Sequence, residues 1–171
     1  EIFLRELVGT GNSVIVPTPA YMPFLSVPKL YDVDVIEIEM LQSGDAETGE
    51  AQWVFDFDAI ERAFAAGCHA FVLCNPHNPI GKVLTLEEEL RLSDLAAQYD
   101  VRIFNDEIHA PFVFEGKHIP FPTISEQAAL QSMTATSASK SFNIPGTKCA
   151  QVLLTNPADR DMWAVKAEWS E

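Results

Sequence analysis

The sequence predicts a three-layer α/β/α domain built on a mostly parallel β-sheet. Short apolar stretches rich in β-branched residues alternate with stretches of helical periodicity, and short loops join them. Several of the apolar stretches lack polar alternation, which is typical of strands that helices bury on both faces. With 171 residues, the chain has the size of one domain.

The first quarter of the chain contains one predicted helix and two predicted strands. Residues 1–8 have the apolar pattern of the end of an amphipathic helix, which Gly9 stops. Residues 14–16 form a short apolar run that suits a buried strand. Residues 33–40 alternate with a period of two and predict an edge or half-exposed strand. Residues 42–52 are polar and acidic and are expected to form a solvated loop.

Helix and strand signals continue through the middle of the chain. Asp56 is a candidate cap for a helix that Gly67 ends. Residues 70–74 predict another buried strand. Residues 85–88 (Thr-Leu-Glu-Glu) form a capping box that opens a helix reaching about Tyr99.

The last third repeats the same alternation. Strands are predicted at residues 101–104, 133–138 and 151–155, and a short helix at residues 125–131. Asn156 and Pro157 give a final helix an N-cap and a proline in its first turn.

Composition excludes several functional classes. The 25 acidic residues outweigh the 11 basic ones, and the net charge of −14 argues against a nucleic-acid-binding face. No apolar run reaches the roughly 18 residues that a membrane span needs, and no signal peptide is visible. The three cysteines give an odd count without C-x-x-C spacing, so we expect no disulfide framework or zinc cluster, and a reducing cytoplasm.

Lys140 lies among small hydroxyl residues in the stretch from Ser137 to Cys149, after a predicted strand. Taken alone, it fits a surface lysine as well as a reactive one, whose amine must be partly deprotonated by burial or neighbouring charge. With Ser137 it forms S-x-x-K, the nucleophile motif of penicillin-binding proteins and β-lactamases, but the companion motifs S-D-N and K-T-G are absent.

Asp106 opens the motif Asp-Glu-Ile-His, which ends at His109 and follows another strand. A nucleotide-hydrolysing enzyme could use such an acid for magnesium, but the chain lacks the required G-x-x-x-x-G-K-[ST] loop. A metal site built from His77 and His109 has no evident third ligand, and two polar loop histidines are the simpler interpretation. No metal is therefore expected.

Asn78 and Tyr21 complete the candidate site. Asn78 lies in a proline-locked loop, Asn-Pro-His-Asn-Pro-Ile-Gly, which is either a simple turn or a device that fixes one amide. Tyr21 lies in a loop predicted at residues 17–24, between Pro19 and Pro23, and is either a packed aromatic or a stacking platform. The three stretches that carry Lys140, Asp106 and Asn78 are all expected to be loops at the carboxyl ends of strands. Together, a lysine, an aspartate, an asparagine and an aromatic ring are what pyridoxal phosphate needs to act as an electron sink.

With these motifs the chain resembles fold-type I pyridoxal-phosphate enzymes, the aspartate aminotransferase superfamily. It is most similar to the MalY/PatB-type cystathionine β-lyases, or cysteine C–S lyases. The resemblance is carried by residues 19–24 (Pro-Ala-Tyr-Met-Pro-Phe), 75–81 (Asn-Pro-His-Asn-Pro-Ile-Gly), 106–109 (Asp-Glu-Ile-His) and 139–146 (Ser-Lys-Ser-Phe-Asn-Ile-Pro-Gly).

The resemblance implies a role for each matching residue. Lys140 would be the Schiff-base lysine and would move the α-proton, and Asp106 would pair with the pyridine nitrogen. The other implied cofactor contacts are Asn78 and His109 near the phenolic oxygen, Tyr21 stacked on the ring, and Ser137 and Lys148 at the phosphate.

The implied reaction is the α,β-elimination of cystathionine or a cysteine S-conjugate to pyruvate, ammonia and a thiol, in a cytoplasmic homodimer. An aminotransferase on the same scaffold, or a truncated remnant that binds only a cofactor or a partner protein, remains an alternative. The resemblance also implies that residues 1–171 are the central part of the large domain, without its N-terminal segment and the C-terminal small domain.

Overall fold

Six strands form the central sheet of the computed structural model, which describes residues 1–44 and 51–166. Their order across the sheet is β2-β1-β5-β6-β7-β8. The first five are parallel, and β8 runs antiparallel to β7. The strands are β1 (Ser13–Thr18), β2 (Asp34–Glu39), β5 (Ala70–Cys74), β6 (Arg102–Asp106), β7 (Ser132–Ser137) and β8 (Ala150–Leu154).

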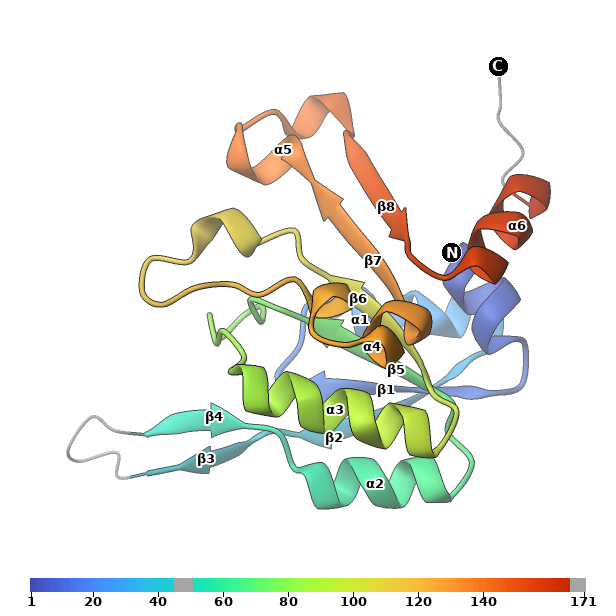
Figure 1. Ribbon diagram of the computed structural model, residues 1–171, viewed down its shortest axis with the longest axis horizontal. Helices are drawn as coiled ribbons and strands as arrows, with labels where there is room; N and C mark the ends of the chain where they lie inside the picture. Colours follow the sequence, from blue (N-terminus) through green and yellow to red (C-terminus); the bar gives the residue numbers. More distant parts are fainter. Residues whose placement is uncertain (45–50, 167–171) are drawn as a thin grey trace.

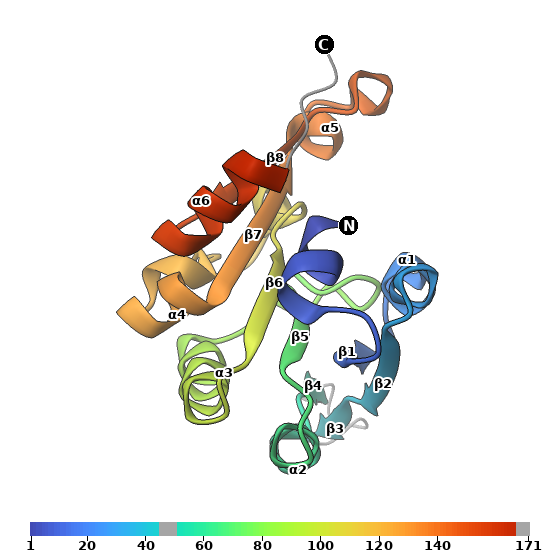
Figure 2. The same cartoon turned by 90° about the vertical axis from the view of Figure 1, so that its right-hand side faces the viewer.

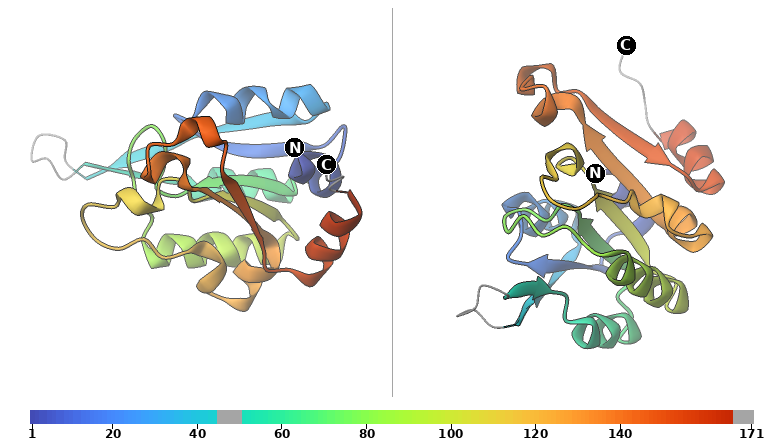
Figure 3. Two further views of the ribbon diagram at one scale, coloured as in Figure 1. Left: turned by 90° about the horizontal axis from the view of Figure 1, so that it is seen from above. Right: turned by 60° about the vertical axis from the view of Figure 1, so that its left-hand side comes forward.

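Helices cover both faces of this sheet, so the predicted three-layer architecture is confirmed (Figures 1 and 2). One face carries α2 (Phe57–Ala65), α3 (Leu86–Gln98) and α4 (Glu126–Gln131). The opposite face carries η1 (Phe3–Val8) and α1 (Met22–Ser26), and Figure 3 shows the strands between these two layers. Helix α6 (Pro157–Lys166) packs Met162 and Trp163 against the same apolar cluster as η1.

The helices start where the sequence predicts because side chains satisfy their first free amides. The Asp56 carboxylate accepts a hydrogen bond from Ala59 N at 2.9 Å. Thr85 and Glu88 form the predicted reciprocal capping box at the start of α3. Ser125 caps α4, and Asn156 accepts from the backbone N–H of Ala158 at 2.9 Å. The helix expected at residues 1–8 is η1, which ends before Gly9.

The predicted strands are confirmed, and their burial explains their sequences. Every residue of β5 is buried, as a continuous apolar run at the centre of a covered sheet requires. The alternating stretch forms β2, which lies at the sheet edge. Strand β6 continues two residues beyond the predicted end at Phe104 and thereby includes Asn105 and Asp106.

Two sequence predictions for the first third of the chain are wrong. The solvated loop expected at 42–52 is replaced in part by an antiparallel pair, β3 (Leu41–Ser43) and β4 (Gln52–Val54), which extends past the end of the main sheet (Figure 1). The remainder of that predicted loop, residues 45–50, lies outside the described residues. The presumed loop after β1 becomes helix α1 at Met22, because Phe24 and Leu25 pack on the apolar cluster beneath.

Short helical turns complete the connections: η2 (Pro28–Tyr31), η3 (Ala110–Phe112), η4 (Phe121–Thr123), α5 (Ala138–Ser141) and η5 (Pro145–Thr147). Among residues 1–44 and 51–166, no helix combines the length and apolar character that crossing a bilayer demands. Cys68, Cys74 and Cys149 are all free thiols.

Candidate active site

A pocket of about 120 Å³ lies where β1, β5, β6 and β7 end. It is lined by residues that follow or end these four strands: Tyr21, Phe24, Cys74, Asn78, Asp106, Ile108, His109 and Lys140. Parallel strands bring their carboxyl ends to one edge of a sheet, and this explains why residues far apart in the sequence meet here. The structure therefore brings together five predicted site residues, namely Tyr21, Asn78, Asp106, His109 and Lys140.

Tyr21 forms the aromatic wall of the pocket. It is the N-cap residue of α1, and its ring meets the Phe24 ring edge-on, with 5.6 Å between centroids and an interplanar angle of 84°. The Tyr21 side chain is 48% exposed. Packing against Phe24 holds the ring while leaving surface for a flat ligand.

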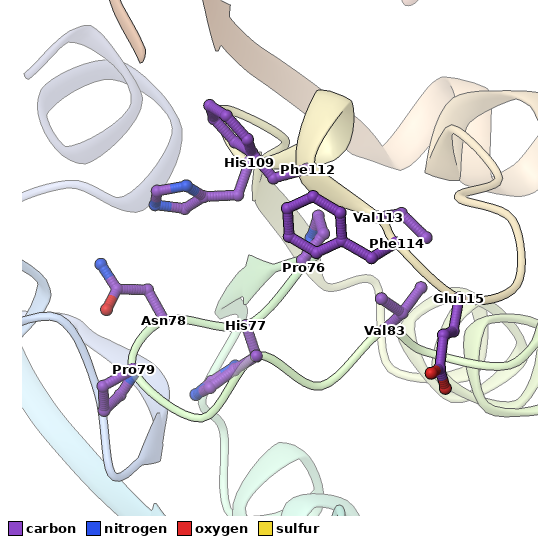
Figure 4. A pocket seen from close by; sticks show the side chains of 11 residues that line it. Pro76, His77, Asn78, Pro79, Val83, His109, Phe112, Val113, Phe114 and Glu115 are labelled. Carbon is purple, nitrogen blue, oxygen red and sulfur yellow. The ribbon is translucent and has the colours of Figure 1, made fainter. Parts of the chain in front are cut away.

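Asn78 is presented by a tightly closed loop after β5. The backbone N–H of His77 donates to Lys82 O at 2.7 Å, and Gly81 N donates to His77 O at 2.7 Å. Gly81 has φ of +72°, a left-handed conformation that glycine adopts without the strain a Cβ would cause. Figure 4 shows the Asn78 amide and the His109 ring projecting to the same side of their loops.

Asp106 is the last residue of β6, and its side chain is fixed by its own loop. Its Oδ1 accepts a hydrogen bond from Ile108 N at 3.0 Å. Burial raises the pKa of the Asp106 carboxyl, while the Ile108 amide and the nearby His109 lower that pKa and the charge of Glu107 raises it. A carboxylate that is poorly solvated in this way favours a cationic partner.

Lys140 reaches the pocket from α5, so the prediction of a loop at this position is wrong. Ser137 creates the helical turn, because its Oγ accepts a hydrogen bond from Ser139 N at 3.0 Å. Lys140 is exposed at the rim of the pocket, so burial does not shield its amine in this chain.

Ser137 and Lys148, the residues expected to hold a phosphate, do not line the pocket among the described residues. The buried Ser137 hydroxyl donates to Cys149 O and caps α5. Lys148 is exposed and follows η5 with φ of +48°. Their phosphate roles remain predictions.

Cys74 is a pocket residue that sequence reasoning missed. It ends β5 and is 3% exposed, and its thiol donates to Pro76 O at 3.3 Å. Burial first, and the charge of Asp106 second, raise the pKa of the Cys74 thiol to about 12. The thiol is therefore protonated at neutral pH. Its position as the last residue of a buried strand, next to Asn75, was the only available signal.

A second hollow of about 430 Å³ adjoins the first and shares Asn78 and His109 with it (Figure 4). It continues over Phe112, Val113 and Phe114, of which Phe114 is 91% exposed. His109 is half-buried and has its ring 6.2 Å from that of Phe112. His109 thus stands between the two hollows.

A layer of buried polar side chains that the sequence analysis also missed lies behind the strand ends. Asn105 Nδ2 donates to Glu107 Oε1 at 2.7 Å, and Phe121 N donates to the same oxygen at 2.9 Å. His118 Nε2 lies 3.3 Å from Glu107 Oε2. On the loop side, Asn75 Nδ2 donates to Glu89 Oε1. These bonds fix the residues that precede Asn78 and flank Asp106.

The sequence matches the family model described as "Aminotransferase class I and II" over residues 2–168. A cystathionine beta-lyase of Corynebacterium glutamicum is 42% identical over 163 residues, which is 95% of this chain and 41% of that protein. Protein MalY of Escherichia coli is 33% identical over 164 residues, 94% of this chain and 39% of MalY.

The fold matches those of solved pyridoxal-phosphate enzymes. One of them is cystalysin from Treponema denticola, whose crystal structure contains a pyridoxal 5'-phosphate cofactor. It superposes on this chain with a TM-score of 0.84 and is 32% identical in sequence. The match covers 92% of this chain and 39% of cystalysin. The chain belongs to the aminotransferase class I and II family. It spans about two fifths of the length of the curated relatives it matches.

Proposed function

We propose that the pocket holds pyridoxal phosphate and that the whole protein is a C–S β-lyase. The observation that carries the proposal is the convergence of Tyr21, Asn78, Asp106, His109 and Lys140 from four strand ends on one pocket. This set of groups fits the cofactor chemically, because it combines an aromatic face, an amide donor, a poorly solvated carboxylate and a primary amine. The cofactor named for cystalysin supports the same assignment.

Each residue has one task in this proposal. Tyr21 stacks on the cofactor ring, and Asn78 donates a hydrogen bond to the phenolic oxygen, with His109 beside it. Asp106 keeps the ring nitrogen protonated, which its buried position favours because an adjacent cation offsets the cost of burying its charge. Ser137 and Lys148 are proposed to reach the phosphate.

The proposed reaction is an α,β-elimination on a sulfur-containing amino acid. When bound, pyridoxal phosphate supplies the electron sink that makes the substrate's α-proton acidic. Lys140 would hold the cofactor before turnover, and the substrate's amino group would displace it, so that the freed Nζ could take the proton from Cα. The C–S bond at Cβ breaks, the thiolate leaves with the bonding pair, and hydrolysis of the remaining three-carbon unit gives pyruvate and ammonia.

The wider setting is proposed from the family. This chain is the central part of a cofactor-binding large domain, as its match over residues 2–168 and its coverage of two fifths of its relatives support. The whole protein acts as a homodimer on a small amino acid. Three free cysteines support a reducing, cytoplasmic setting.

A steady-state assay of the full-length protein tests the activity. Cystathionine and an S-substituted cysteine are supplied with the cofactor, and pyruvate release is followed without any keto acid. The proposal requires pyruvate formation that a Lys140→Ala variant loses. Amino transfer to an added keto acid, with no pyruvate from either thioether, would contradict it.

An aminotransferase is the second candidate, because the matching family model bears that name. The five pocket residues suit both reactions, since both begin with removal of the α-proton. The lyase is favoured by the names of the relatives, which include a cystathionine beta-lyase at 42% identity. A remnant that binds only a cofactor or a partner is the third possibility, and a full-length protein without either activity would support it.

A further inference from the structure

We propose that His77 is a positioning residue that braces the loop carrying Asn78 against the loop carrying Tyr21, through a hydrogen bond from its Nε2–H to the carbonyl oxygen of Pro19. The Nε2–O distance is 2.9 Å, and the two residues lie 58 positions apart in the sequence. The inference rests on the proposed function, because it concerns the two residues assigned to the cofactor ring and its phenolic oxygen.

His77 is held at three points. Its backbone N–H donates to Lys82 O and its carbonyl accepts from Gly81 N, both at 2.7 Å, so its main chain closes the loop after β5. Its side chain is then the only group of His77 free to reach another segment, and it reaches Pro19. The residue is 3% exposed, so water does not compete for this contact.

The chemistry of the contact fixes the tautomer of the ring. Pro19 O can only accept, so Nε2 must carry the proton. Burial, with a smaller contribution from the charge of Lys82, lowers the pKa of His77 and favours the neutral ring, while the contacts with the backbones of Pro19 and Cys74 raise that pKa. Nδ1 has no hydrogen-bond partner among the described residues. The Nε2 bond to Pro19 O thus joins the loop that carries Asn78 to the loop that carries Tyr21.

The two ends of the brace lie next to cofactor-facing residues. Asn78 follows His77 directly, and Tyr21 lies two residues after Pro19. Thr18 is anchored separately, since its carbonyl accepts from Met40 N at 2.8 Å. Figure 4 shows the His77 ring extending away from the His109 ring; His77 lines the larger hollow but is not among the residues that line the smaller pocket with Tyr21 and Lys140. The brace sets the separation between the amide and the aromatic wall.

Two substitutions separate a donor from a space-filling role. His77→Gln keeps an N–H near the position of Nε2, whereas His77→Leu keeps a comparable apolar volume and removes the donor. His69→Leu is the matched control, because His69 also contacts a backbone carbonyl, that of Tyr99 at 3.1 Å, but lies outside the pocket lining. Each variant is titrated with pyridoxal phosphate, and the dissociation constant is read from the visible absorbance.

We expect His77→Leu to raise the dissociation constant about tenfold, as the loss of one hydrogen bond that orders two loops predicts. His77→Gln and His69→Leu should stay within about twofold of the parent chain, because a change of that size is a small fraction of one hydrogen bond. Equal affinity of His77→Leu and the parent chain, or equal weakening by His77→Gln and His77→Leu, would overturn the proposal.

Hydrogen exchange of the cofactor-free chain provides a readout that does not need binding. The Phe24 amide, which donates to Tyr21 O at 2.9 Å, should exchange faster in His77→Leu and be unchanged in His77→Gln and His69→Leu. If the parent chain fails to bind the cofactor, the proposed function fails for this chain, and the exchange rates alone decide whether the brace exists. Unchanged exchange in His77→Leu would refute it.

Discussion

Asn75 donates a hydrogen bond from Nδ2 to Oε1 of Glu89 over 2.7 Å and so connects the first residue after β5 to a fully buried acid on α3. Asn75 Oδ1 accepts from Leu84 N at 3.1 Å, which closes the loop that presents Asn78. Glu89 Oε2 has no partner among the described residues. A buried polar layer therefore supports the loop of the candidate site, and the burial of the Glu89 carboxylate within that layer lowers the free energy of unfolding.

The first prediction concerns Glu89 and pH. Burial, together with the charges of Glu107 and Glu88, raises the pKa of Glu89 from 4.5 to about 7, while Asn75 and His118 counteract the rise. As the pH rises from 4.5 to 7 the unfolded chain releases this proton before the folded chain does, so Glu89 lowers stability over that window and no further above it. The loss is about 3 kcal/mol.

Glu89→Gln removes this titration but keeps an oxygen for Asn75. Relative to the parent chain, its free energy of unfolding should therefore rise steadily between pH 4.5 and 7, as measured by urea denaturation at several pH values. Glu87→Gln, an exposed position on the same helix, serves as the control and should show no such gain. Parallel pH profiles of Glu89→Gln and the parent chain would contradict the prediction.

Asp106→Asn should raise the stability of the chain and weaken its binding of pyridoxal phosphate. The amide keeps an oxygen for the Ile108 N–H, but it removes a carboxylate whose pKa is raised by burial and whose ionisation at neutral pH therefore opposes folding. We expect a higher free energy of unfolding at pH 7 and a dissociation constant for pyridoxal phosphate that is about tenfold higher or more, because a charge-assisted bond is lost. Lower stability with unchanged affinity would refute the assigned role.

Asp159 anchors α6 to the sheet and should dominate the stability of that end of the domain. Its carboxylate, 2% exposed, pairs with both terminal nitrogens of Arg102, and Arg102 Nε donates to Gln131 O at 3.1 Å. Asp159→Ala leaves the guanidinium without its partner and should cost about 3 kcal/mol in denaturant unfolding. Asp161→Ala, exposed on the same helix, should cost far less. If Asp159→Ala and Asp161→Ala lowered the free energy of unfolding by similar amounts, the ion pair between Arg102 and Asp159 would contribute little to stability.

The sequence was informative wherever one segment determines its own structure. The apolar run of β5 and the side-chain caps Asp56, Thr85 and Asn156 each carry a local signal, and the structure contains each of them. The site residues could be grouped because they follow parallel strands, whose carboxyl ends must share one edge.

The missed features depend on partners distant in the sequence. Helix α1 has only five residues, too few to show a period, and is stabilised by packing of Phe24 and Leu25 on the sheet. Strands β3 and β4 have three residues each, so alternation cannot be recognised. Glu89 follows two other glutamates and suggests a solvated helix face, and only Asn75 and the surrounding core make it a buried acid.

The central claim, that Lys140 bonds pyridoxal phosphate in this pocket, is tested most directly by chemical trapping. The purified chain is mixed with the cofactor, the visible band is recorded, borohydride is added, and the modified peptide is located by mass spectrometry. We predict a single phosphopyridoxyl group on Lys140, and its loss in Lys140→Ala with Lys148→Ala still labelled. Labelling that spreads over the other lysines, or that persists unchanged in Lys140→Ala, would contradict the account.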